Sequence, residues 1–371
     1  MNPMERVQRA LRFEETDRIP LDLGSTCTSI HKTAHANLKR YLGMEDGEHT
    51  IISRVMQTVD PDVRLLKRFD IDIRHAALKD ADPWMRIGEN LYRDEWGIVY
   101  RDCGPYCEMI EFPLAEIETA AELDNYRFPD PLDERRFAGL EDQILKRSED
   151  GKYPVMLGGF SESFLGLPSW LMGHQKCYTD LMLNEQLITA LLDRLEDYFT
   201  RLARETLRRA GHLVQIVKVA DDLGTQQGPI LSPELYRRLI KPRQSSLYKL
   251  IKENTDAKLF LHSCGSVYEL IADFIDMGVD ILNPVQVSAK NMEPKRLKEE
   301  FGDRLVFWGG GCDTQNVLPN GTVEEVRQEV QSRIEAFAPG GGFVFCAVHN
   351  IQYDVPPENI VAMYDTAKMP V

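Results

Sequence analysis

The chain has 371 residues, of which 43% are hydrophobic, 9% aromatic and 28% charged. This mixture is typical of a globular protein and excludes a disordered or collagen-like chain. The 44 basic and 59 acidic residues give a formal net charge of −15, so we expect no general electrostatic affinity for nucleic acid or for anionic lipid.

Short apolar or β-branched runs that end in Gly, Pro, Asp or Asn recur along the chain, and helical periodicity separates most of them. We predict eight strands, at residues 20–24, 71–77, 154–159, 213–220, 258–263, 279–283, 305–309 and 342–347. Strands that alternate with helices through short loops imply a parallel sheet in an α/β protein. Eight such units favour closure into a (β/α)8 TIM barrel.

Several of the intervening helices carry clear start and stop signals. Ser232, followed by a proline and a glutamate, predicts a helix start. Thr322 and Glu325 form a capping box ahead of a longer helix. Glycines end two shorter helices, which we predict at residues 268–277 and 294–301.

Residues 89–113 interrupt this rhythm, because they alternate like an antiparallel hairpin around residues 102–105. We interpret this inserted hairpin as a lid or an interface element. The sequence contains no fixed-period repeat and no low-complexity linker. We therefore predict that residues 1–371 form a single domain with an N-terminal elaboration.

The seven cysteines are an odd number, and the start of the chain is charged and lacks the apolar core of an export signal. We therefore expect a cytoplasmic protein whose cysteines are buried, catalytic or metal-binding rather than paired. No apolar run approaches the ~18–20 residues that a membrane span needs, so we expect no membrane association.

Active sites of (β/α)8 barrels lie at the carboxyl ends of the strands, so side chains there are the functional candidates. Residues at the opposite ends are expected to be structural. The candidates are Ser25, Thr26, Arg74, His75, Ser161, Glu162, Asp221, Asp222, His262, Cys264, Asn283, Gln286, Cys312, Asp313, Cys346, His349 and Gln352.

The sharpest group among these candidates is His262 and Cys264, at the end of the fifth predicted strand. Residues two apart on an extended segment project to the same face, so the imidazole and the thiol can bind one ion. Catalytic zinc takes three protein ligands of N and S type and keeps one position open. The third ligand could be Cys346, His349 or Cys312. The structural alternative is that these cysteines bind no metal and pack in the core as small apolar residues.

Two adjacent carboxylates, Asp221 and Asp222, end the fourth predicted strand. On an extended segment they point in opposite directions, so one can face the site as a general acid or base. The other can cap a loop or pair with a cation. Glycines at 158–159 and 309–311 match neither the P-loop nor the dinucleotide pattern, and we interpret them as tight barrel corners.

An ordered set of segments extends over nearly the whole chain and carries a family resemblance. The segments are DRIPLDLG at 17–24, DEWGIVYR at 94–101, DDLGTQQGPILSPELYRRLIKPR at 221–243, LHSCGSVYELI at 261–271, DILNPVQ at 280–286 and HNIQYDVPPENIVAM at 349–363. Together they resemble the uroporphyrinogen decarboxylase family, and this resemblance implies a TIM barrel. The family contains decarboxylases and corrinoid-linked methyltransferases, so the resemblance alone does not decide the reaction.

The resemblance implies that a true decarboxylase carries an arginine-rich segment directly after the first strand, which binds a polycarboxylated porphyrinogen. The matching residues here, 24–30, contain no arginine. Without such bidentate cations a polyanionic ligand lacks its main attraction. In favour of a decarboxylase, His349 lies seven residues before the PPEN at 356–359 and matches the C-terminal active-site histidine of the decarboxylases.

The methyltransferase branch uses a His-x-Cys pair and a distant thiol to hold zinc, and His262 and Cys264 match that pair. In register with the PPEN segment, the third position falls on His349, while Cys346 is the nearest thiol. The resemblance therefore implies a zinc-dependent methyltransferase that moves a methyl group between a corrinoid (cobalamin) protein and a thiol or another small acceptor or donor.

The implied site has three sets of residues. They are catalytic Asp221, Asp222 and His349, the metal ligands His262, Cys264 and either Cys346 or His349, and the cofactor-binding Asn283, Gln286 and Gln352. The implied partners are a corrinoid protein and a small methyl donor or thiol acceptor, and a homodimer is compatible with the family. Two alternatives stay open, which are a decarboxylase that uses Asp222 and His349 and a non-catalytic corrinoid- or tetrapyrrole-binding protein.

Overall fold

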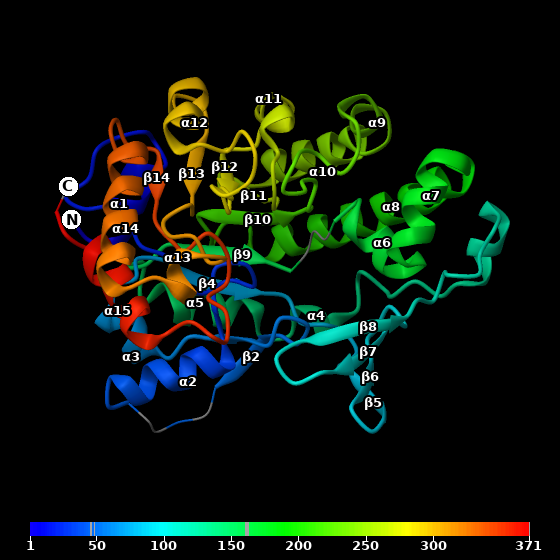
Figure 1. The fold of residues 1–371 in the computed structure, drawn as a ribbon. Helices are drawn as coiled ribbons and strands as arrows, with labels where there is room; N and C mark the ends of the chain where they lie inside the picture. The colour runs from blue at the N-terminus through cyan, green and yellow to red at the C-terminus, as the bar shows by residue number, and fades with distance from the viewer. Residues whose placement is uncertain (45–46, 48, 160–162, 371) are drawn as a thin grey trace.

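A curled parallel sheet forms the centre of the computed structural model, which describes residues 1–44, 47, 49–159 and 163–370 (Figure 1). Its strands follow the order β14-β13-β12-β11-β10-β9-β4, and all neighbours pair in parallel. The bounds are β4 Arg74–Ala77, β9 Val155–Gly158, β10 Ile216–Ala220, β11 Lys258–His262, β12 Ile281–Asn283, β13 Val306–Trp308 and β14 Phe343–Val344. Each of these strands lies within a predicted one.

The first predicted strand, residues 20–24, closes the sheet without becoming a regular strand. Leu21 forms a parallel bridge with Phe345, whose backbone N–H donates to Pro20 O at 2.9 Å. On the other side, Asp72 N donates to Leu21 O at 2.9 Å. This segment therefore takes the eighth position, between β14 and the residues that lead into β4, and the predicted (β/α)8 barrel is confirmed.

Helices surround the barrel and connect its strands (Figure 1). Their bounds are α1 Pro3–Ala10, α2 Lys32–Tyr41, α3 Val63–Arg68, α4 Glu134–Phe137, α5 Leu140–Ser148, α6 Gly166–Met172, α7 His174–Leu183, α8 Glu185–Ala210, α9 Pro233–Leu239, α10 Lys241–Asn254, α11 Ile271–Asp276, α12 Pro294–Phe301, α13 Val317–Asn320, α14 Val323–Phe337 and α15 Pro357–Ala367, with 3-10 turns η1 Ala120–Asn125 and η2 Tyr268–Leu270. The Ser232 side chain caps α9, and the capping box of Thr322 and Glu325 starts α14, as predicted. In the described parts of the chain, no helix is both long and apolar enough to cross a membrane.

Two small antiparallel sheets are added to the barrel. The first contains β1 Ile30–His31, β2 Thr50–Ser53 and β3 Thr58–Asp60, and the second contains β5 Met85–Gly88, β6 Leu91–Arg93, β7 Val99–Asp102 and β8 Cys107–Glu111. The hairpin predicted around residues 102–105 is the β7–β8 turn, in which Asp102 is paired with Cys107. The insertion is larger than the predicted 89–113, because it begins at β5 and has four strands.

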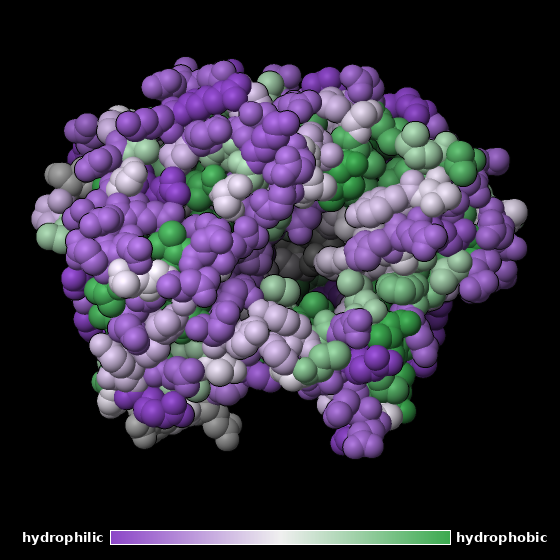
Figure 2. Space-filling model, viewed as in Figure 1, coloured by the Kyte–Doolittle hydropathy of each residue, from purple (hydrophilic) through white to green (hydrophobic). Residues whose placement is uncertain are grey.

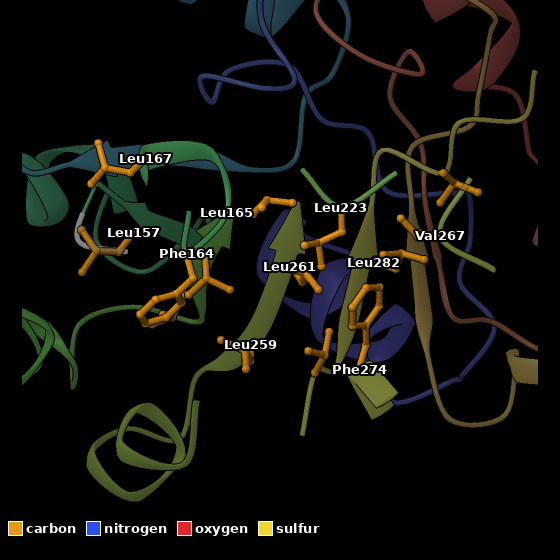
Figure 3. Close-up of a cluster of buried hydrophobic side chains, with 14 of the residues drawn as sticks. Leu157, Phe164, Leu165, Leu167, Leu223, Leu259, Leu261, Val267, Phe274 and Leu282 are labelled. Carbon is orange, nitrogen blue, oxygen red and sulfur yellow. The ribbon is translucent and has the colours of Figure 1, made fainter. Parts of the chain in front are cut away.

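Side-chain alternation divides the barrel strands between two cores. Leu157, Leu259, Leu261 and Leu282 point to the side where the helices pack, together with Phe274 of α11 (Figure 3). The residues between them fill the barrel interior: Ile73, Met156, Ile216, Phe260, Ile281, Val306 and Val344. Two residues further along each strand, the same inward face carries His75, Gly158, Lys218, His262, Asn283, Trp308 and Cys346. The interior is thus apolar at one end and largely polar at the carboxyl end.

Asp72 connects the closing segment to the barrel from a fully buried position. Its carboxylate accepts hydrogen bonds from Arg6 Nη1 and Arg18 Nη1, both at 2.7 Å, and from Leu21 N at 2.9 Å. One side chain therefore joins α1, the loop after it and the closing segment to the residues before β4.

The variant Asp72→Ala is expected to lower the free energy of unfolding by about 3 kcal/mol, because it leaves buried guanidinium groups without their shared carboxylate. Urea unfolding followed by circular dichroism measures the change. Asp303→Ala is the matched control, since that side chain is 79% exposed and its loss should cost no more than about 0.5 kcal/mol. Equal midpoints for the two variants would contradict the role of Asp72.

Candidate metal centre

Three side chains converge at the carboxyl ends of the strands. His262 is the last residue of β11, Cys264 follows two residues later, and His349 lies in the loop after β14. One ligand atom from each lies within 4.8 Å of the other two. His262 Nε2 is 3.4 Å from Cys264 Sγ, and the ring centroids of His262 and His349 are 5.3 Å apart. These separations let the three side chains reach a single ion.

The other ring nitrogen of His262 is held by a buried amide. His262 Nδ1 lies 2.6 Å from Asn283 Oδ1, and Asn283 Nδ2 donates to Trp308 O at 2.8 Å. The second bond fixes which end of the amide is the oxygen, so Nδ1 must be the donor. Nε2 is therefore the ring nitrogen directed at Cys264 and His349, as in metal sites where an outer partner orients the ligating imidazole.

A glycine turn follows Cys264 and is tightly enclosed. Gly265 has φ +86°, and a Cβ there would lie 2.3 Å from the Gly224 carbonyl carbon, so only glycine fits. Gly265 N donates to Gln286 Oε1 at 2.8 Å. Gln286, a predicted cofactor-binding residue, thus holds the loop that carries Cys264.

Asp222 faces this group from the solvent side. Its Oδ1 accepts from Cys264 N at 3.0 Å and lies 3.7 Å from His262 Nε2, while 56% of the side chain is exposed. The surrounding protein acts to raise the pKa of Asp222, but the charge of His262 and the Cys264 N–H outweigh it and lower the pKa below its usual value. Asp222 is therefore an ionised acceptor beside the metal-ligand group.

Asp221 points the other way and is 1% exposed. Its carboxylate accepts from the Ser163 hydroxyl, from the backbone N–H groups of Phe164 and Leu165 at 3.1 Å, and from Gln244 Nε2 at 2.9 Å. Burial raises its pKa to about 6, although these hydrogen bonds act in the opposite direction. The Asp221 carboxylate thus holds the loop before α6, while the backbone N–H of Asp221 donates to His262 O at 2.9 Å.

The two histidines differ in their electrostatic surroundings. Burial lowers the pKa of His349 to about 3, and the charge of His262 acts in the same direction. Burial also acts to lower the pKa of His262, but the thiols of Cys27 and Cys264 outweigh it and raise the pKa well above its usual range. His349 is thus already neutral, the form that binds a metal, whereas His262 would release a proton on metal binding.

Cys27 is a neighbour of this group that sequence reasoning missed. It is 4% exposed, and its Sγ lies 3.1 Å from Ser25 Oγ. Burial acts to raise the pKa of the thiol, but the charges of Lys218 and His262 outweigh it and bring the pKa to about 6. The available signal was its position directly after the first predicted strand, next to the candidates Ser25 and Thr26.

The two other cysteines considered as ligands lie elsewhere. Cys346 is 1% exposed and belongs to the barrel interior, because side-chain alternation continues past β14 and directs it inward. Cys312 is fully buried, with Sγ 3.2 Å from Glu329 Oε2 of α14. The structure brings neither of them into the group of His262, Cys264 and His349.

Other predicted residues have structural partners. His75 Nε2 lies 2.7 Å from Asp22 Oδ1, and Asp22 Oδ2 accepts from Trp308 Nε1 at 2.9 Å. Asp313 accepts from the backbone N of Gln315 at 2.9 Å, which caps its own loop. These contacts stabilise the rim of the barrel.

Gln352 joins the inserted sheet to the loop that carries His349. Tyr106, in the β7–β8 turn, donates its hydroxyl to Gln352 Oε1, and Gln352 Nε2 donates to Asn350 O at 2.7 Å. Gln352 was predicted to bind a cofactor, and here it connects two loops.

Arg74 was expected at the carboxyl end of a strand, and this prediction is wrong. The strand starts at Arg74 rather than at residue 71, so the side chain lies at the opposite end of the barrel, with its guanidinium 3.6 Å from the centroid of the Tyr153 ring. Ser161 and Glu162 lie outside the described residues.

Comparison with known proteins then places the chain. A family model described as Uroporphyrinogen decarboxylase (URO-D) matches residues 111–369. The chain belongs to the uroporphyrinogen decarboxylase family. It is 26% identical over 252 residues to a uroporphyrinogen decarboxylase of Psychromonas ingrahamii, a match that covers 64% of this chain and 65% of that protein, just under two thirds of its length.

Another family member and one solved structure agree with this placement. A uroporphyrinogen decarboxylase of Pseudoalteromonas atlantica is 26% identical over 316 residues, which cover 81% of this chain and 79% of that protein. A structure described as a methyltransferase from Methanosarcina mazei has a TM-score of 0.68 and 17% sequence identity, and the match covers 99% of this chain and 98% of the other. At this identity the structural likeness shows a shared fold.

We expect alanine substitution of the two adjacent aspartates to change the free energy of unfolding by different amounts. Asp221→Ala should lower the free energy of unfolding by about 1–3 kcal/mol, because it leaves buried N–H donors without an acceptor. Asp222→Ala should change it by no more than about 0.5 kcal/mol, since water can replace this exposed carboxylate. Urea unfolding of the metal-free proteins compares them, and a larger loss for Asp222→Ala would refute the assignment.

Proposed function

We propose that this protein is a zinc-dependent methyltransferase that moves a methyl group between a corrinoid protein and a thiol or another small molecule. The observation that carries the proposal is the convergence of His262, Cys264 and His349 at the carboxyl end of the barrel. Two imidazoles and one thiolate form a donor set that zinc prefers. Three protein ligands leave a fourth position for a substrate, as in catalytic zinc sites.

The surroundings of the three ligands fit this assignment. The hydrogen bond between His262 Nδ1 and Asn283 leaves Nε2 free to bind a metal, and Gln286 fixes the turn after Cys264. When bound, zinc would stabilise a substrate thiol as its thiolate, which is a strong nucleophile toward a methyl group at neutral pH.

The residues around the ligands supply orientation and proton handling. Asp222 Oδ1 lies 3.7 Å from His262 Nε2 on the exposed side, where it can accept the proton that an incoming thiol gives up. Its hydrogen bond from Cys264 N keeps the carboxylate next to the thiol ligand. Asp221 takes no part in this step, because it is buried against the loop before α6.

A corrinoid partner needs access to the ligands from outside. The exposed Asp222 shows that solvent reaches this part of the barrel. Figure 2 shows a hollow near the middle of this molecular face. The proposed docking of a partner over the carboxyl ends of the strands is compatible with this opening.

Decarboxylation of uroporphyrinogen is the second candidate, favoured by the names of the sequence relatives and by the position of His349. Against it, residues 24–30 contain no arginine, and Arg74 lies at the opposite end of the barrel. A ligand with many carboxylates requires several cations, so the methyltransferase assignment has the better support.

Protein purified under reducing conditions should contain about one zinc per chain by elemental analysis. His262→Ala, Cys264→Ala and His349→Ala should each reduce the zinc content sharply, because each removes one of three ligands. Asn283→Ala should keep the ligands but weaken zinc binding by about 10–100-fold, measured by competition with a chelator.

Cys346→Ala and Cys103→Ala are the controls for this experiment, since they remove a thiol from the barrel interior and one from the exposed β7–β8 turn. Both should retain full zinc. A folded wild-type protein without zinc would contradict the proposed function, and loss of zinc in Cys346→Ala but not in His349→Ala would contradict the ligand set.

The zinc-loaded protein should accelerate methyl transfer from methylcobalamin to a small thiol. The loss of the methyl-cobalt absorbance measures the rate of this transfer. His262→Ala should remove this activity, because the thiol would no longer be activated. Uroporphyrinogen should remain unchanged under the same conditions. Decarboxylation that disappears in His349→Ala would instead establish the second candidate.

A further inference from the structure

A lysine projects into the polar end of the barrel. Lys218 alternates along β10 with Ile216, whose side chain fills the interior, and is only partly exposed. The Lys218 side chain passes over Gly158 of β9, where an added Cβ would lie 3.6 Å from Lys218 Cδ. The ammonium group donates to Thr26 Oγ1 at 2.5 Å. Thr26 is a neutral partner, so this contact is a hydrogen bond and not an ion pair.

Two carboxylates at the carboxyl end of the barrel, Asp22 and Asp222, already have hydrogen-bond partners other than Lys218. Asp22 is bound by His75 and Trp308, and Asp222 lies against His262 and the Cys264 backbone. Among the residues that the structure describes, no carboxylate forms an ion pair with Lys218. The Cys27 thiol interacts with Lys218 electrostatically but is buried. A partly buried cation that no carboxylate neutralises can attract an anion locally, although the net charge of −15 repels anions in general.

Lys218 lies within a short distance of the metal-ligand group. Ala220, two residues further along β10, is paired in register with His262, and two residues of a strand span about 6.6 Å. Thr26 is joined to the His349 loop, because Asn350 Nδ2 donates to Thr26 O at 2.8 Å. A molecule held at Lys218 and Thr26 would therefore reach His262 and His349 with a short aliphatic chain.

We propose that Lys218 and the Thr26 hydroxyl form a carboxylate subsite, which selects a short-chain carboxylic acid whose reactive group sits at His262, Cys264 and His349. The two donors converge on one point and match the two oxygens of a single carboxylate. This inference rests on the proposed function, since it names the substrate class of the same site. It makes Lys218 a specificity-determining residue and assigns the protein a small monocarboxylate rather than a polycarboxylated macrocycle.

The test uses two thiols of the same length, 3-mercaptopropionate and its uncharged amide, titrated calorimetrically into the zinc-loaded protein. The acid should bind about tenfold or more tightly than the amide, because it adds a charge-assisted hydrogen bond. Lys218→Gln should remove this preference, and Lys218→Arg should keep most of it. Thr26→Val should reduce the preference several-fold while preserving side-chain shape.

Lys258→Gln is the matched control, because Lys258 starts the neighbouring strand at the other end of the barrel and lies 3.2 Å from Asp280 Oδ1. This variant should keep the full preference for the acid. A wild-type protein that binds acid and amide equally, or a folded Lys218→Gln protein that still prefers the acid, would overturn the proposal.

A second titration separates this proposal from the proposed function. Propionate and propionamide, which contain no thiol, are titrated into metal-free protein, and the acid should again bind more tightly in wild type and not in Lys218→Gln. If the protein takes up no zinc but shows this preference, the subsite is supported and the methyltransferase assignment is wrong. If zinc binds and the preference is absent, the subsite alone is refuted.

Discussion

The structure depends on one constraint, which is the alternation of side chains along the strands of a closed parallel barrel. The residues of one parity pack against the helices and those of the other parity fill the interior, so each inward position near a carboxyl end lies close to inward positions of neighbouring strands. His262, Asn283 and Lys218 come from three strands and owe their proximity to this geometry alone. Local sequence determines only the residue that occupies each position.

The same constraint explains how a family fold holds different chemistries. An apolar layer of Ile216, Phe260 and their neighbours closes the barrel interior below the site, and polar side chains above it are left to bind ligands. Asn283 orients His262 from a buried position above this layer, whereas Asp222 approaches from the solvent. The division between a fixed buried support and an exposed acceptor gives the site one rigid side and one side that a substrate can reach.

The periodicity of the sequence predicted the barrel and the capped helices, because strands and caps are determined by residues close together in the chain. It left the third ligand of the predicted metal site open among Cys346, His349 and Cys312, since all three lie at the carboxyl ends of predicted strands and only the direction of the backbone there separates them. It missed Cys27 and Lys218, whose roles depend on contacts across the barrel. Arg74 was misplaced because the strand starts three residues later than its apolar run.

The closure of the barrel also determines when, during synthesis of the chain, the site can form. Leu21 bridges Phe345, and Ser29 N donates to Asn350, so the first and last parts of the chain share one wall of the barrel. A ribosome must therefore synthesise nearly the entire polypeptide before His349 can join His262 and Cys264. Nascent chains and C-terminally truncated fragments therefore lack the complete group of His262, Cys264 and His349.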